Sequence, residues 1–139
     1  KATSSEFDKK GLHIIGLLNE WTKDGKKIQG TEKNLGGTMR LGSYEAKLRK
    51  NSLIQKIYKT NLIKERHRHR YEVNIAFKEK FEKKGMFFSG LSPDGSLPEI
   101  IELKNHPWFI GVQFHPEFKS RPLSPHPLFS SFIKASKNH

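Results

Sequence analysis

A histidine and a glutamate stand two residues apart near the C-terminal end of the chain, at His115 and Glu117. They follow residues 108–114, an apolar run that reads as a buried strand. In an extended chain, side chains two residues apart project to the same side. The carboxylate can therefore accept the Nδ1–H of the imidazole and leave Nε2 facing outward as a base. This is the base and its orienting carboxylate in a nucleophilic triad, and a surface histidine beside a loop glutamate is the simpler alternative.

The position of the pair favours the catalytic interpretation. Pro116 separates the two residues, and proline has no N–H for sheet pairing, so the strand ends where these side chains emerge. Active sites of α/β sheets lie at the carboxyl ends of strands. A triad also needs a nucleophile, and the 139 residues contain no cysteine. Disulfides and thiolate metal sites are therefore excluded within this sequence.

A second candidate is the segment ERHRHRYEV at residues 65–73. In an extended segment, alternation gives it two faces, with Arg66, Arg68 and Arg70 on one and His67, His69 and Tyr71 on the other. A solvated charged strand and a phosphate-binding stripe of arginine forks both fit this pattern. A zinc site at the two histidines is weaker, because no third ligand accompanies them.

Composition limits the chain to a few classes of protein. Its 139 residues suffice for one domain with a core, and Lys and Arg outnumber Asp and Glu by 26 to 14, a formal charge of +12. This charge suits anionic partners such as nucleotides, nucleic acid or lipid headgroups without selecting among them. No apolar run reaches the roughly 18 residues of a membrane span, so no transmembrane helix and no membrane partner are expected.

The elements that position these residues follow from hydrophobic patterning. Short apolar runs predict strands at residues 12–18, 86–90, 99–103 and 108–114, with the last two forming a pair. Helices are predicted after caps at Asn51 and Asn74. A final helix carries an apolar stripe of Leu128, Phe129, Phe132 and Ile133. A turn at residues 24–25 and an extended, glycine-dense segment at 35–42 complete the pattern, which indicates an α/β layer structure with antiparallel pairs.

Four segments resemble the CTP synthase family: LGGTMRLG at 35–42, ERHRHRYEVN at 65–74, NHPWF at 105–109 and QFHPEF at 113–118. The histidine–glutamate pair alone is typical of the broader class I glutamine amidotransferases, and the arginine–histidine segment narrows the match. The resemblance covers essentially the whole chain. It implies an α/β, flavodoxin-like fold with a mixed central sheet and flanking helices, in which residues 1–139 form the C-terminal portion of a class I glutamine amidotransferase domain.

The resemblance also implies an activity. In the family, a synthase domain uses ATP and Mg²⁺ to phosphorylate UTP, a glutaminase domain releases ammonia from L-glutamine, and the ammonia gives CTP. GTP activates the glutaminase step. The resemblance places the general base at His115, its orienting carboxylate at Glu117 and glutamine contacts at Glu6 and Arg70. An arginine fork can hold the α-carboxylate of glutamine, and a carboxylate can hold its α-ammonium group.

The family's nucleophilic cysteine falls upstream of Lys1, so a partial domain without glutaminase activity of its own is expected. We expect no cofactor or metal within it, because Mg²⁺ and ATP belong to the synthase domain. The resemblance implies a cytoplasmic homo-oligomer that does not bind nucleic acid. The rival is a stand-alone basic module that binds nucleotide or nucleic acid through the segment Arg66 to Arg70.

Overall fold

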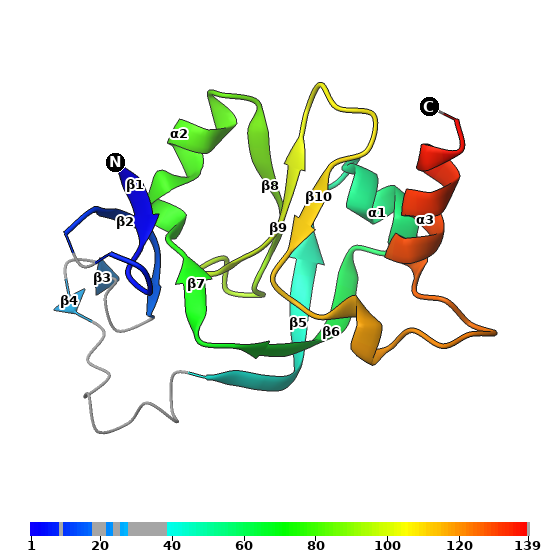
Figure 1. The fold of residues 1–139 in the computed structure, drawn as a ribbon, viewed down its shortest axis with the longest axis horizontal. Helices are drawn as coiled ribbons and strands as arrows, with labels where there is room; N and C mark the ends of the chain where they lie inside the picture. The colour runs from blue at the N-terminus through cyan, green and yellow to red at the C-terminus, as the bar shows by residue number, and fades with distance from the viewer. Residues whose placement is uncertain (9, 18–21, 24–25, 28–38, 139) are drawn as a thin grey trace.

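The computed structural model describes residues 1–8, 10–17, 22–23, 26–27 and 39–138. The larger of its sheets has five antiparallel strands in the order β10-β9-β8-β5-β6 (Figure 1). Their bounds are β5 (Arg40–Leu48), β6 (Leu62–His69), β8 (Met86–Leu91), β9 (Pro98–Leu103) and β10 (Ile110–Val112). The strands predicted around residues 86–90 and 99–103 are confirmed, as is the antiparallel pairing of β9 with β10.

A smaller sheet of three strands lies beside the first, in the order β1-β2-β7. Its strands are β1 (Ala2–Ser4), β2 (Leu12–Leu17) and β7 (Tyr71–Val73). β1 and β2 run parallel, whereas β2 and β7 are antiparallel. Two-residue strands β3 (Thr22–Lys23) and β4 (Lys26–Lys27) pair with each other, and the predicted turn at 24–25 lies outside the described residues, as does most of 35–42.

The helices cover the two sides of this arrangement. They are α1 (Leu53–Tyr58), the 3₁₀ turn η3 (Ile75–Phe77), α2 (Lys78–Glu82), the 3₁₀ turn η4 (Pro116–Phe118) and α3 (Pro127–Ser136). Figure 1 shows α1 and α3 side by side, while α2 lies toward the small sheet. The main core forms between the large sheet and the pair α1 and α3, from Ala46, Leu48, Ile54, Ile63, Ile100, Phe114 and Leu128. Each fully buried aliphatic side chain in it contributes about 1.5–3 kcal/mol.

The first helix begins one residue later than the sequence predicts. Asn51 has a φ of 64° and lies outside the helix, and Ser52 is the N-cap, its Oγ accepting from the backbone N–H of Gln55 at 3.2 Å. The carboxylate of Glu102 on β9 accepts the N–H groups of Leu53 and Ile54, both at 3.0 Å. A buried carboxylate therefore satisfies the first free donors of α1 and fixes the helix to the sheet.

The second predicted cap is confirmed. The Oδ1 of Asn74 accepts the N–H of Ala76 at 2.9 Å, and η3 continues directly into α2. The Phe81 ring on α2 meets the Phe88 ring of β8 edge to face, at 6.0 Å between centroids. Gly85, with a φ of 85°, follows the helix in the conformation that glycine adopts most readily.

Two predictions for the C-terminal third are wrong in part. The run 108–114 forms a strand only over Ile110–Val112, which is half-buried at the edge of the large sheet. The final helix exists, but of its apolar stripe only Leu128 is buried, whereas Phe129, Phe132 and Ile133 are exposed. The apolar pattern identified the helix correctly and did not reveal how little of it the described residues cover.

Candidate active site

His115 and Glu117 are in contact. The Nδ1 of His115 donates to Oε1 of Glu117 at 2.7 Å, and none of the described residues bonds to Nε2. Glu117 lies in the 3₁₀ turn η4, so a tight turn brings the pair together and not the extended chain that the sequence predicts. The hydrogen bond from His115 lowers the pKa of Glu117 below its usual range. The carboxylate therefore stays ionised and orients the ring.

Neighbouring residues hold the ring and its backbone in place. The Phe118 ring stacks on the imidazole with 4.9 Å between centroids and 19° between planes. The backbone N–H of His115 donates to the carbonyl of Arg66 on β6 at 2.8 Å. Lys119, which follows the turn, donates from Nζ to the carbonyl of Lys64 at 2.7 Å. The segment that carries the pair is thus fixed along β6.

The buried carboxylate of Glu65, on β6, lies next to this segment. Oε1 of Glu65 accepts from the Tyr58 hydroxyl at 3.0 Å and from Nε2 of His126 at 3.1 Å, and the Lys119 ammonium lies 3.3 Å away. Burial alone would raise the pKa of Glu65, but the hydrogen bonds from His126 and Tyr58 outweigh it, and the pKa is lowered. Burial and the Glu65 charge raise the pKa of Tyr58. This cluster joins α1, β6 and the start of α3.

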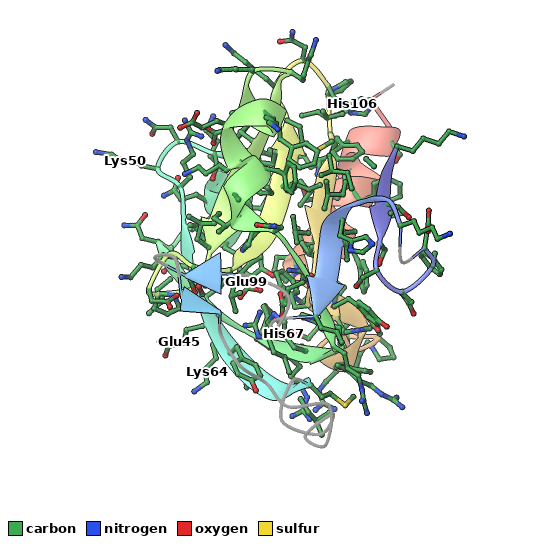
Figure 2. All side chains as sticks on the ribbon, turned by 90° about the vertical axis from the view of Figure 1, so that its left-hand side faces the viewer. Glu45, Lys50, Lys64, His67, Glu99 and His106 are labelled. Carbon is green, nitrogen blue, oxygen red and sulfur yellow. The ribbon has the colours of Figure 1, made fainter. Side chains whose placement is uncertain are left out.

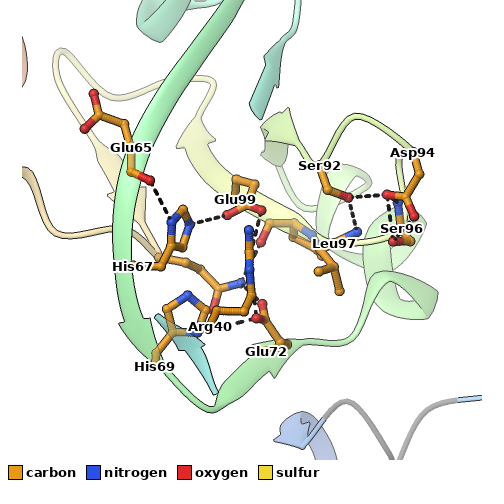
Figure 3. Close-up of polar contacts among 12 residues, drawn as sticks. Arg40, Glu65, His67, His69, Glu72, Ser92, Asp94, Ser96, Leu97 and Glu99 are labelled. Carbon is orange, nitrogen blue, oxygen red and sulfur yellow. Dashed lines mark hydrogen bonds and ion pairs between the residues drawn. The ribbon is translucent and has the colours of Figure 1, made fainter. Parts of the chain in front are cut away.

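A second buried cluster joins the two sheets (Figure 3). The Arg40 guanidinium lies 2.7 Å from Oε1 of Glu99, and the other oxygen of Glu99 contacts Nε2 of His67 at 2.8 Å. Nδ1 of His67 faces the carbonyl of Glu65 at 3.1 Å. Both ring nitrogens of His67 therefore face oxygen atoms, and the Glu99 carboxylate lies between this ring and the Arg40 guanidinium.

Glu72 on β7 extends this cluster into the small sheet. Its Oε1 lies 3.6 Å from Arg40 and 3.5 Å from Nδ1 of His69, and its Oε2 accepts from Nε2 of Gln113 at 2.8 Å. Burial raises the pKa of Glu72 to about 7, although the Arg40 charge opposes the shift. Burial likewise lowers the pKa of His69 to about 4, so its Nδ1 donates to the carbonyl of Tyr71 at 3.0 Å from a neutral ring.

Glu6 and Arg70, the two predicted glutamine contacts, lie at the same end of the small sheet, where β1 and β2 end and β7 starts. Ser4 at the end of β1 stands opposite Ile15, and Tyr71 at the start of β7 stands opposite Leu17. Glu6 follows β1, and Arg70 directly precedes β7. The ends of β1 and β2 and the start of β7 therefore coincide. Arg70 also directly follows β6, the strand to which the His115 backbone is bonded.

The alternation predicted for residues 65–73 is confirmed along β6 but ends at Arg70, which is half-buried between β6 and β7 of the other sheet. Arg66 and Arg68 are exposed, whereas His67 is buried and His69 is half-buried. Figure 2 shows His67 and Glu99 inside the molecule and Lys64 at its margin. Within the described residues, no group of three His, Cys, Asp or Glu side chains is arranged to hold a metal ion. The phosphate-binding role of the arginines stays a prediction.

The sequence reasoning missed the buried carboxylates Glu65, Glu72 and Glu99 and the amide of Gln113. The alternation of side chains along the strand could have revealed Glu65. It stands two residues before His67, so in an extended strand it faces the same, inner side as the histidine. The contacts of Glu99 and Gln113 join segments far apart in the chain, and no local pattern reports them.

Comparison with known proteins gives the family. The family model described as Glutamine amidotransferase class-I matches residues 14–135. The chain belongs to this family. A CTP synthase of Pelagibacter ubique (strain HTCC1062) is 87% identical over 138 residues, which make up 99% of this chain and 26% of that protein. A CTP synthase of Rhodospirillum rubrum is 57% identical over 136 residues, or 97% of this chain and 25% of that protein.

A solved amidotransferase structure agrees with this assignment. The glutaminase domain of Trypanosoma brucei CTPS, with bound acivicin, matches with a TM-score of 0.81 at 35% identity, covering 99% of this chain and 51% of that one. The resemblance to CTP synthases and the α/β amidotransferase fold are confirmed. The chain spans about a quarter of the length of its curated relatives and corresponds to part of a glutaminase domain. No described helix is long and apolar enough to cross a membrane.

Proposed function

We propose that this chain supplies the general base, its orienting carboxylate and two substrate contacts to the glutaminase site of a CTP synthase. His115 takes the proton from a thiol nucleophile and later activates the water that hydrolyses the thioester, while Glu117 holds the imidazole in the required tautomer. The observation that carries the proposal is the 2.7 Å contact between Nδ1 of His115 and the Glu117 carboxylate, which leaves Nε2 as the base.

Arg70 and Glu6 are proposed to bind the two ends of the amino acid. The guanidinium suits the α-carboxylate of L-glutamine, and the carboxylate suits the α-ammonium group. Two placements support this assignment: both residues lie at the same end of the small sheet, and Arg70 directly follows β6 in the chain. With the α-carbon held there, the side-chain amide extends toward the base.

The remaining reactants belong to the whole protein. We infer that ammonia released here reaches a synthase domain that uses UTP, ATP and Mg²⁺, with GTP as activator, in a cytoplasmic homo-oligomer. The names and identities of the relatives support this inference, since CTP synthases match the chain over nearly all its length. The nucleophilic cysteine must come from outside these 139 residues, which contain none.

The test uses the full-length protein that carries these residues. Release of glutamate from L-glutamine and formation of CTP from UTP and ATP are followed with either glutamine or ammonium chloride as nitrogen source. We expect both sources to give CTP, and glutamine to be hydrolysed. CTP formation from neither source, together with salt-sensitive binding of nucleic acid, would instead support the basic binding module.

A further inference from the structure

One hydrogen bond connects the segment of the proposed base to the segment of the proposed substrate contact. Nε2 of Gln113 donates to Oε2 of Glu72 at 2.8 Å and to the carbonyl of Pro98 at 2.6 Å. Gln113 stands two residues before His115, and Glu72 stands two residues after Arg70. Gln113 follows β10 of the large sheet, whereas Glu72 is the central residue of β7 in the small sheet. The bond therefore joins the large sheet to the small one, between the segments that carry His115 and Arg70.

The surroundings of Glu72 make this bond sensitive to charge. The side chain is completely buried and is faced by Arg40 from β5, His69 from β6, Glu99 from β9 and the amide of Gln113. Glu99 holds Arg40 at 2.7 Å, so Glu72 receives only the weaker contact at 3.6 Å. His69 is neutral for the reason given above and adds no positive charge. Two buried carboxylates thus share one guanidinium, with burial raising the pKa of Glu72 to about 7.

A neutral residue would serve the fold as well as this carboxylate or better. A glutamine side chain could accept the same hydrogen bond from Gln113 without placing a second negative charge beside Glu99. A charged group in this position therefore indicates a role in the neighbouring site.

We propose that Glu72 is a positioning residue, which sets the place of Arg70 relative to His115 by accepting a hydrogen bond from Gln113 with one carboxylate oxygen while the other faces the Arg40 charge at 3.6 Å. This inference deepens the proposed function and rests on it. Arg70 would contact glutamine at its α-carboxylate, away from the reacting amide. Misplacing it weakens substrate and transition state alike, which raises KM and leaves kcat nearly unchanged.

The ionised form of Glu72 attracts the Arg40 guanidinium across their 3.6 Å contact, and the protonated form does not. In the wild-type protein the site should therefore loosen as the pH falls below about 7. The side chain of a Glu72→Gln variant is neutral at every pH. Its KM for glutamine should therefore resemble that of the wild type at acid pH and exceed it at alkaline pH. If the substitution only damaged the packing, it would raise KM by the same factor at acid and at alkaline pH.

The experiment measures glutaminase kinetics of the full-length protein at pH 6 and pH 8.5, for the wild type, Glu72→Gln and Glu102→Gln. Glu102 is a matched control, since it is also a buried strand carboxylate but lies on β9 of the large sheet, where it caps α1 instead of contacting Gln113. We expect Glu72→Gln to raise the KM for glutamine about tenfold at pH 8.5 and less than threefold at pH 6, with kcat little changed, a size typical of lost uniform binding. Glu102→Gln should lower the melting temperature and keep the wild-type ratio of the two KM values.

A third variant covers the case in which Glu72→Gln does not fold. Gln113→Asn is one methylene shorter and should lose the bond to Glu72, so it too should raise KM at pH 8.5 with little change in kcat. Equal KM values for wild type and Glu72→Gln, or an increase of equal size at both pH values, would overturn the positioning role while leaving the glutaminase function standing. A wild-type protein that hydrolyses no glutamine would overturn the proposed function, and the positioning role with it.

Discussion

The backbone N–H of His115 donates to the carbonyl of Arg66 at 2.8 Å, although the two residues are far apart in the chain. This bond ties the turn that carries the histidine–glutamate pair to the strand that leads into Arg70. The proposed base His115 and the proposed substrate contact Arg70 are therefore both attached to the same strand, β6. On the inner side of this strand, the buried Glu65 carboxylate accepts from Tyr58 and His126, and His67 contacts Glu99.

Replacing Glu117 with glutamine should slow glutamine hydrolysis with little effect on glutamine binding. A carboxamide neither fixes the Nδ1–H tautomer as strongly nor stabilises the imidazolium that forms during proton transfer. We expect kcat to fall roughly 10²- to 10⁴-fold, the range of a positioned base and its partner. Steady-state release of glutamate measures it, with the exposed Glu79 on α2 giving the matched control Glu79→Gln. A fall of less than threefold would remove Glu117 from the mechanism.

Replacing Glu65 with alanine should destabilise the fold. The change leaves Tyr58 and His126 without their common buried acceptor, and breaking a buried charged pair in this way costs about 3–5 kcal/mol. The pKa of Glu65 is lower in the folded protein than its ordinary value, so its contribution is complete above the ordinary pKa and is lost as the pH falls through the folded one. Urea unfolding should show a large difference at pH 7 that shrinks toward pH 3. A difference that grows in acid would contradict the assignment.

Replacing Glu72 with glutamine should have the opposite effect on stability. Burial raises the pKa of this group from 4.5 to about 7, so the folded protein holds a proton that the unfolded chain has lost between those values. Wild-type stability should therefore fall as the pH rises from about 4 to 7, by up to about 3 kcal/mol at 1.36 kcal/mol per pKa unit. Glu72→Gln should melt higher than the wild type at pH 8 and at the same temperature near pH 4. A variant that melts lower at pH 8 would show that Arg40 stabilises the carboxylate more than burial opposes it.

The isolated 139-residue chain should release no ammonia from glutamine. It contains no cysteine, so His115 has no thiol to activate and no thioester can form. The purified chain, its helices and strands checked by circular dichroism, is assayed at the concentrations that give turnover for the full-length protein. Turnover above that of buffer alone would mean that another residue acts as the nucleophile.

Local patterns in the sequence predicted the strands β2, β8 and β9, the Asn74 cap and the meeting of His115 with Glu117. They succeeded because apolar runs, capping side chains and a two-residue spacing each report a short-range preference. The same spacing predicted the pair by the wrong local geometry, because Pro116 starts a 3₁₀ turn and this turn, not an extended strand, brings the two side chains together.

What the sequence did not reveal depends on contacts between distant segments. Arg40, Glu72 and Glu99 lie on three strands of the two sheets and Gln113 follows a fourth, so they meet only when both sheets are in place. Read along the chain, each is an ordinary polar residue of a strand or its margin. The exposure of the apolar stripe of α3 could not be predicted for the same reason. The sequence shows which residues form such a stripe, but not whether another part of the structure covers it.

Replacing His115 with asparagine asks whether this histidine is the base of a glutaminase. In the full-length protein, glutamine hydrolysis and CTP formation from ammonium chloride are measured side by side for the wild type and His115→Asn. We expect hydrolysis to fall by roughly 10²- to 10⁴-fold, the contribution of a positioned base, while ammonia-dependent synthesis stays within about twofold. Glutamine hydrolysis within threefold of the wild type in the His115→Asn protein would contradict it.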